Sequence, residues 1–65
     1  MRSATMINEL HDQRKKFMLD TTPTDRIIEE DFYSEYSTFV TSAGGDYTTY
    51  RVYGKKPGEF RCYIK

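Results

Sequence analysis

Bulky apolar side chains are scarce in this 65-residue chain, and aromatic rings make up much of what could fill a core. Leu, Ile, Val and Phe make up about 18% of the residues, below the roughly 20% that often marks disorder. Two facts oppose disorder. The net charge is zero, so no global repulsion keeps the chain open. Six Tyr and four Phe can each bury roughly 150–250 Å². We therefore expect a folded domain with an aromatic core, and a homodimer that pools two thin cores is a reasonable expectation.

The length of the chain predicts one small domain, residues 1–65. A single cysteine, Cys62, cannot form an intramolecular disulfide, which argues against a small secreted scaffold. Residues 1–20 show no apolar run typical of a signal peptide, and no stretch approaches the roughly 20 apolar residues of a membrane span. We expect no membrane association and a reducing, cytoplasmic compartment.

The N-terminal half of the chain predicts two helices. Over about residues 4–19, apolar side chains recur at helical spacing, and Arg14 interrupts their stripe. The members of that stripe are Met6, Ile7, Leu10, Phe17 and Met18. The run Thr22-Pro23-Thr24-Asp25 then combines a capping hydroxyl, a proline at the first helical position and a carboxylate in the first turn. This pattern predicts a second helix over about residues 23–35.

The C-terminal half predicts antiparallel strands. Residues 46–53 and 59–65 are rich in aromatic and β-branched residues and flank Pro57-Gly58, which suits a type II turn. Residues 37–42 fit a strand better than a continuation of the second helix, although both alternatives stay open here. Ala43–Asp46 is a turn in either case. The expected fold is α+β, with two N-terminal helices packed on a C-terminal antiparallel hairpin or three-stranded meander.

Register decides which side chains of the hairpin share a face. Pairing Val52 with Phe60 collects the apolar side chains of both strands on one side, and it places Arg51 opposite Arg61. The apolar side then holds Tyr50, Val52, Phe60, Cys62 and Ile64. The other side holds Tyr47, Thr49, Arg51, Tyr53, Arg61, Tyr63 and Lys65.

That second side is the candidate partner-binding surface. Its proposed contact residues are Arg51, Tyr53, Arg61, Tyr63, Lys55 and Lys56. Arg and Tyr are enriched at protein interface hot spots, which favours an acidic protein surface as the partner. They also suit an RNA or single-stranded DNA backbone with stacked bases. The alternative is that these are ordinary solvated residues whose stems cover the sheet.

The charges are strongly segregated along the chain. Residues 1–18 carry four basic and two acidic side chains, residues 19–37 carry one and six, and residues 38–65 carry five and two. The acidic side chains of the middle segment include Glu29, Glu30, Asp31 and Glu35. They predict a solvated acidic helix face or, alternatively, a row of carboxylates that mimics nucleic-acid phosphates. Zero net charge counts against mimicry, which gains from a negative overall field.

Catalytic and metal sites are not expected. One histidine, His11, and one cysteine cannot supply the four ligands of a structural zinc site. Gly44-Gly45 lacks the spacing of a phosphate-binding loop, so no cofactor is predicted. One catalytic alternative is a metal-independent ribonuclease that uses the Arg and Tyr residues of the hairpin with Glu59.

Taken with the absence of a catalytic constellation, the surface predicts a small intracellular protein-binding module, an inhibitor or an adaptor. Phage and mobile-element proteins that regulate one host factor share this profile. The alternative function is binding of RNA or single-stranded DNA through the basic aromatic side of the hairpin.

Overall fold

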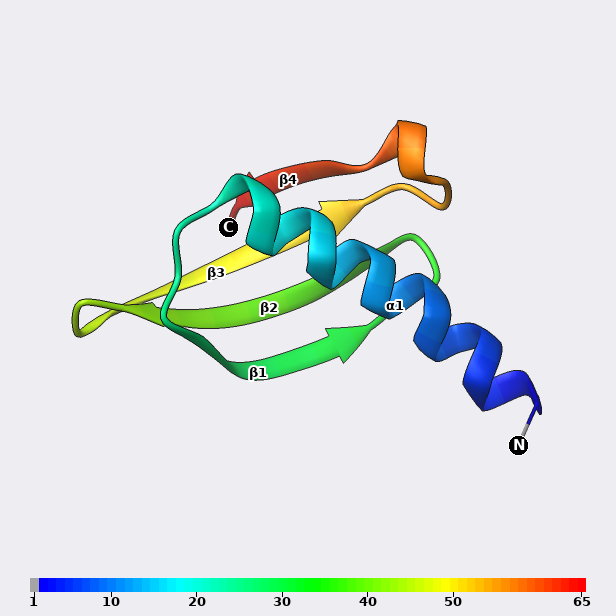
Figure 1. Cartoon of the computed structure of the whole chain (residues 1–65), viewed down its shortest axis with the longest axis horizontal. Helices are drawn as coiled ribbons and strands as arrows, with labels where there is room; N and C mark the ends of the chain where they lie inside the picture. Colours follow the sequence, from blue (N-terminus) through cyan, green and yellow to red (C-terminus); the bar gives the residue numbers. More distant parts are fainter. Residues whose placement is uncertain (1) are drawn as a thin grey trace.

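The computed structural model describes residues 2–65, with side chains from Glu9 onward. It has an α+β architecture, as predicted, in which one helix precedes a four-stranded antiparallel sheet with strand order β1-β2-β3-β4 (Figure 1). The elements are α1 (Arg2–Thr21), β1 (Arg26–Phe32), β2 (Tyr36–Ala43), β3 (Asp46–Tyr53), a 3₁₀ turn η1 (Pro57–Glu59) and β4 (Arg61–Ile64). No helix among the described residues is long and apolar enough to cross a membrane.

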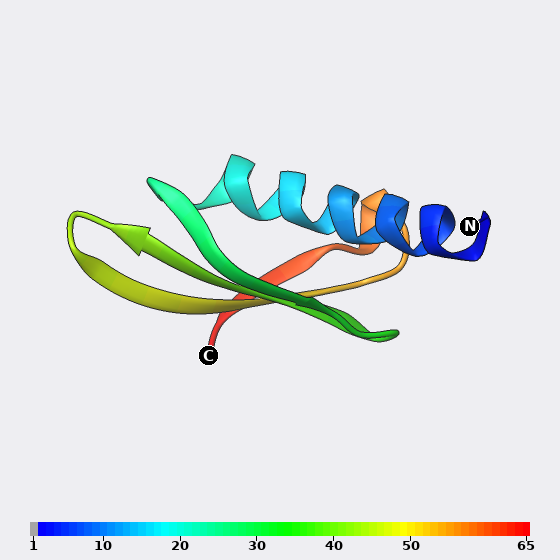
Figure 2. The ribbon, with the colours of Figure 1, turned by 90° about the horizontal axis from the view of Figure 1, so that it is seen from below.

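The helix and the sheet form two layers (Figure 2). Helix α1 packs on one face of the sheet, mainly against β2, β3 and β4. We call this the covered face and the opposite side the open face. The buried apolar core lies under the helix and consists of Met18, Phe39, Tyr50 and Val52. Partly buried side chains surround it, namely Phe17, Ile27, Phe60 and Cys62.

The predicted helix over residues 23–35 is wrong, because residues 26–32 form β1. Strand β1 pairs with β2 in an antiparallel register that shifts between Ile27 and Glu29. The shift leaves Ile28 as an extra residue in β1. Such a bulge breaks the alternation of side chains that marks a strand, so the sequence pattern of β1 is concealed.

The run Thr22-Pro23-Thr24-Asp25 terminates a helix instead of starting one. Thr22 donates both its backbone N–H, at 2.9 Å, and its hydroxyl, at 2.7 Å, to the carbonyl oxygen of Met18. The carboxylate of Asp25 accepts a hydrogen bond from the backbone N–H of Gly44, 3.0 Å away. Hydroxyl and carboxylate side chains satisfy backbone groups at both ends of helices and in turns, so this run was open to two interpretations.

The central hairpin matches the predicted strands closely. Strands β2 and β3 pair without interruption from Tyr36↔Tyr53 to Ala43↔Asp46. The turn between them is Gly44-Gly45, with φ of +59° and +89°. Positive φ at both central residues is the conformation that a two-residue hairpin turn requires, and glycine adopts it without steric cost.

The connection between β3 and β4 differs from the predicted type II turn. Residues Pro57–Glu59 form the 3₁₀ turn η1, and the glycine with positive φ is Gly54, at +114°. A Cβ atom on Gly54 would lie 2.7 Å from the carbonyl oxygen of Glu59. The chain therefore needs glycine where it leaves β3, because the two ends of the connection approach too closely for any side chain.

The predicted register of β3 and β4 is wrong by two residues. Val52 pairs with Cys62 and Arg51 pairs with Tyr63, so the two arginines are not directly opposite each other. The 3₁₀ turn extends to Glu59, so β4 begins at Arg61, two residues later than the predicted strand. Ile64, which was expected in the apolar layer, is 71% exposed.

Arg14 links the helix to both turns at one end of the sheet. Its guanidinium is fully buried and donates to the carbonyl oxygens of Gly54 (2.9 Å), Tyr33 (2.8 Å) and Ser34 (2.9 Å). A fourth hydrogen bond, of 3.1 Å, goes to the hydroxyl of Ser37. Burial lowers the pKa of Arg14 from its ordinary value. The residue that interrupts the apolar stripe of the helix is thus a polar anchor within the interior.

Candidate functional site

The open face presents the alternate side chains of all four strands. Paired residues of neighbouring antiparallel strands lie on the same face. One row across the sheet is Tyr36, Tyr53 and Arg61, and the next row is Asp31, Thr38, Arg51 and Tyr63. A third row contains Glu29, Val40 and Thr49.

Four tyrosine rings form a continuous ladder on the open face. The ring centroids of Tyr33 and Tyr36 are 4.9 Å apart, and those of Tyr36 and Tyr53 are 5.1 Å apart. Tyr53 meets Tyr63 in an edge-to-face arrangement at 5.8 Å. These separations lie within the favourable range for aromatic pairs. The ladder therefore holds its rings in place before any partner binds.

Arg51 lies on this ladder. Its guanidinium carbon is 5.0 Å from the centroid of the Tyr36 ring, and its Nη1 donates to the hydroxyl of Tyr53 at 3.3 Å. This hydrogen bond raises the pKa of Arg51, so the side chain stays charged. Within the described residues, the buried Nε of Arg51 has no hydrogen-bond partner. Stacking on Tyr36 orients the guanidinium. Among residues 9–65, no carboxylate forms an ion pair with it.

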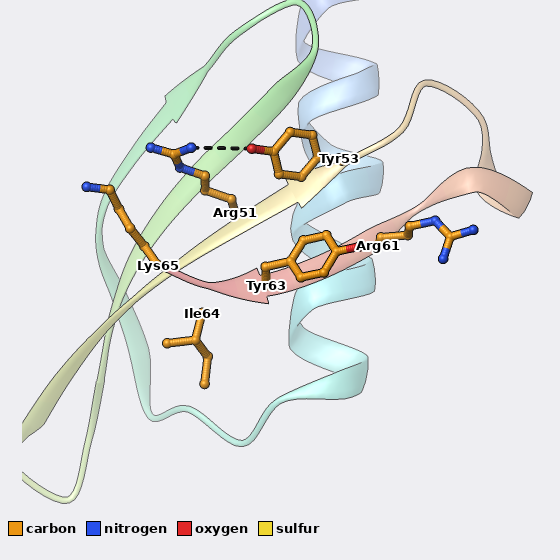
Figure 3. Close-up of a pocket in the computed structure, with 6 residues that line it drawn as sticks. All are labelled: Arg51, Tyr53, Arg61, Tyr63, Ile64 and Lys65. Carbon is orange, nitrogen blue, oxygen red and sulfur yellow. Dashed lines mark hydrogen bonds between the residues drawn. The ribbon is translucent and has the colours of Figure 1, made fainter.

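A groove of about 590 Å³ opens beside β3 and β4 (Figure 3). Its lining residues are Arg51, Tyr53, Arg61, Tyr63, Ile64 and Lys65. The structure thus brings together four of the six residues that were proposed as contacts. The other two, Lys55 and Lys56, lie outside it, in the connection that follows β3. The Nζ of Lys55 is 3.4 Å from a carboxylate oxygen of Glu35.

Sequence reasoning missed part of the open face. Tyr33 and Tyr36 extend the ladder toward β1, but the region of Tyr33 was assigned to a helix. The alternation of Tyr36, Thr38 and Val40 is the available signal, and β2 begins one residue before the predicted strand. Lys65 was placed on the correct side of the hairpin but was not proposed as a contact.

Strand β1 gives the open face a second, opposite charge. Glu29 and Asp31 pair with residues of the open face and are exposed, and we call them the acidic strip. The predicted acidic helix face is wrong, because these residues lie in strand β1. The strand directs Glu29 and Asp31 to the open face and Glu30 to the covered face. Among residues 9–65, no ion pair includes the acidic strip or the three cations of the groove. Arg26, at the start of β1, also lies on the open face, because it pairs with Ser42. The open face therefore carries the cations of the groove at one edge and the acidic strip, together with Arg26, at the other.

A polar cluster on the covered face has the residue types of a hydrolase triad. The Nδ1 of His11 is 3.0 Å from the hydroxyl oxygen of Ser37, and its Nε2 is 2.7 Å from a carboxylate oxygen of Glu30. Ser37 is fully buried, so a nucleophile there could not reach a substrate. The cluster fits a structural role, since His11 also stacks on Phe39 at 5.0 Å.

Lys15 completes this cluster, with its Nζ 3.0 Å from the same carboxylate of Glu30. Partial burial alone would raise the pKa of Glu30. The hydrogen bonds from Lys15 and His11 outweigh that effect and hold the pKa below its usual value.

The ribonuclease alternative needs a carboxylate beside the arginines. Glu59 lies in η1, outside the groove, and its carboxylate accepts a hydrogen bond from the backbone N–H of Lys55 at 3.3 Å. Within the part of the chain that the structure describes, no three His, Cys, Asp or Glu side chains cluster as metal ligands would.

Comparison of the chain with protein-family models, with curated proteins and with solved structures gives no match.

Proposed function

We propose that this protein is a protein-binding module, of the inhibitor or adaptor type, and that its open face is the binding surface. The observation that carries the proposal is the pairing of a basic, tyrosine-lined groove with an acidic strip on one uncovered sheet face. Tyr and Arg supply the side chains that dominate binding energy at protein interfaces. A preformed aromatic ladder lowers the entropic cost of binding, because the rings are already ordered.

The mixed charge of the open face favours a protein over a nucleic acid. A single strand of RNA or DNA is negative along its whole length, and a strand that crossed the sheet from the groove would meet Glu29 and Asp31. Zero net charge also provides no long-range attraction for a polyanion. A protein surface can match a positive region and a negative region at once, and such complementarity gives specificity.

Binding to an array of extended peptides that differ only in charge would test the proposal. The labelled protein should bind peptides that contain acidic residues next to aromatic ones. The double variant Arg51→Glu with Arg61→Glu should lose this binding and stay folded. Lys16→Glu, on the exposed surface of α1, makes a charge change on the opposite layer and should bind as the unmodified protein does.

A parallel titration with labelled single-stranded RNA and DNA separates the two partner classes. Nucleic-acid binding through the groove would weaken by orders of magnitude between about 50 and 200 mM salt, because counterions are released from the backbone. Tight, salt-sensitive binding that depends on Arg51 and Arg61 would overturn the protein-partner proposal. Absence of oligonucleotide binding together with peptide selectivity would support it.

A further inference from the structure

We propose that the open face binds a second copy of this chain, in a face-to-face dimer whose two-fold axis runs parallel to the strands between β2 and β3. This inference rests on the proposed function, because it names the partner of the same surface. It follows from where the charges lie. The acidic strip belongs to β1 at one edge of the sheet, and the cations of the groove belong to β3, β4 and the residue after β4.

A two-fold axis parallel to the strands reverses the strand order of the second sheet. Strand β4 of one copy then lies over β1 of the other, and β2 lies over β3. Each positive region faces a negative one, and the contact occurs twice, as it must in an isologous dimer. Sheets that pack face to face keep their strand directions within about 30° and lie about 10 Å apart, which is within the reach of Arg and Lys side chains.

The rows of the sheet indicate which residues would meet. A rotation about this axis keeps each residue at its own level along the strands. Glu29 of one copy therefore comes near Lys65 of the other, because Lys65 is bonded through its backbone N–H to Thr49, in the same row. Tyr36 comes over Tyr53, which continues the tyrosine ladder from one sheet to the other.

Another way of pairing the open faces is disfavoured by the same charges. An axis that lies in the interface but runs across the strands would place β1 over β1 and β4 over β4. With this axis at the level of Glu30, carboxylates would face carboxylates. The cations of the groove would lie over β3 and β4 of the other copy, whose open-face side chains include no carboxylate in the described chain. The charge pattern thus selects one relative orientation of the two copies.

Two further properties of the chain favour self-association. Zero net charge removes long-range repulsion between copies. The core of the described part of the chain has only four buried apolar residues, so burying the exposed rings of Tyr33 and Tyr63 would add apolar contacts to a thin interior. Strands of seven, eight, eight and four residues outline a face of roughly 430 Å². That is about half of the roughly 800 Å² that each partner contributes to a standard interface, so we expect a weak dimer, with a dissociation constant that is micromolar or higher.

A charge-swap experiment tests the dimer. Variant A is Arg51→Glu with Arg61→Glu, and variant B is Glu29→Lys with Asp31→Lys. Sedimentation equilibrium over millimolar to low micromolar protein should show a dimer for the unmodified chain. Each variant alone should dimerise at least about 10-fold more weakly, because charges of one sign then predominate on its open face. An equimolar mixture of A and B should dimerise again.

The outcomes separate this inference from the proposed function. A monomeric unmodified chain would overturn the dimer, and the peptide array would still decide whether the open face binds other proteins. A dimer that neither variant weakens would also overturn it, because its interface would lie elsewhere. Far-UV circular dichroism checks that the variants fold. If a double variant unfolds, the single changes Lys65→Glu and Glu29→Lys, both at exposed side chains, repeat the swap.

Discussion

Arg14 and Arg51 lie on opposite sides of the same sheet, and their surroundings differ in nearly every respect. Arg14 is fully buried on the covered face and donates four hydrogen bonds to groups of this chain. Arg51 lies on tyrosine rings of the open face and donates one long hydrogen bond, to Tyr53. A buried charge that donates four hydrogen bonds within its own chain is committed to the fold. No carboxylate of the described chain pairs with the charge of Arg51, so the same residue type stabilises one face and leaves an unpaired charge on the other.

Replacing each arginine by methionine should separate the two roles most clearly. Arg14→Met removes a fully buried side chain and all four of its hydrogen bonds, which should cost about 4 kcal/mol. A domain of this length has roughly 3–10 kcal/mol of stability, so the variant should lose a large part of its free energy of unfolding. Arg51→Met should change stability little. Urea denaturation followed by circular dichroism measures both, and equal losses would show that the two faces do not differ as described.

A second pair of substitutions compares the apolar contributions of the faces. Phe39 is fully buried and contacts the core, so Phe39→Ala should lower the free energy of unfolding by about 3–5 kcal/mol. Tyr63 is 53% exposed, so Tyr63→Ala should lower it by less than about 1 kcal/mol. Urea denaturation measures the loss in free energy of unfolding for both variants. If Tyr63→Ala lowered the free energy of unfolding by several kcal/mol at every protein concentration, the tyrosine ladder would be a stabilising element of the single chain.

The pH dependence of stability should report on the covered face. The pKa of Glu30 is lowered in the folded state from a reference of 4.5. Its contribution to stability is therefore present above that reference and is lost as the pH falls through the folded-state pKa. Because the side chain is 37% exposed, we expect less than about 1 kcal/mol. Glu30→Gln should flatten the acid limb of the stability profile, and Lys15→Met should flatten it partly. An unchanged profile for both variants would contradict the assigned ion pair.

A further comparison of the two faces concerns thiol chemistry at two adjacent positions. Burial raises the pKa of Cys62 on the covered face, so less of the reactive thiolate is present at neutral pH. A cysteine at the neighbouring open position, Tyr63→Cys in a Cys62→Ser background, should react with a disulfide reagent at least about 10-fold faster than Cys62 does in the unmodified chain. Both should react alike in denaturant. Equal rates in the folded proteins would show that the sheet does not shield Cys62.

The two faces also differ in how well the sequence predicts them. The set of Arg51, Tyr53, Arg61 and Tyr63 was assigned to one side correctly although the register was wrong by two residues. A slip of two keeps every side chain on its face, whereas a slip of one exchanges the faces. The alternation of side chains along a strand therefore predicts which face each residue occupies. The residue that lies opposite on the neighbouring strand depends, in addition, on the geometry of the connection. Here the 3₁₀ turn between β3 and β4 set that geometry.

The acidic side of the open face could not be predicted in the same way. The bulge at Ile28 conceals the alternation of β1, and the residues around Pro23 match a helix start as well as a helix exit. Only pairing with β2 resolves this ambiguity, and that pairing is a tertiary effect. The role of Arg14 was hidden for a similar reason, because its carbonyl acceptors lie in turns whose positions depend on the whole sheet.

The hydrogen bonds of Arg14 have a consequence for the order in which the molecule assembles. Three of its acceptors, 19, 20 and 40 positions away along the chain, lie in two separate turns, and the fourth, the hydroxyl of Ser37, lies in β2. A helix that docked on a half-formed sheet would bury the guanidinium before some acceptors were in place. Such intermediates are penalised, so we expect the helix and both turns to become ordered in one cooperative step. Arg14 would thereby couple docking of the helix to completion of the sheet, and an intact open face would exist only on completely folded molecules.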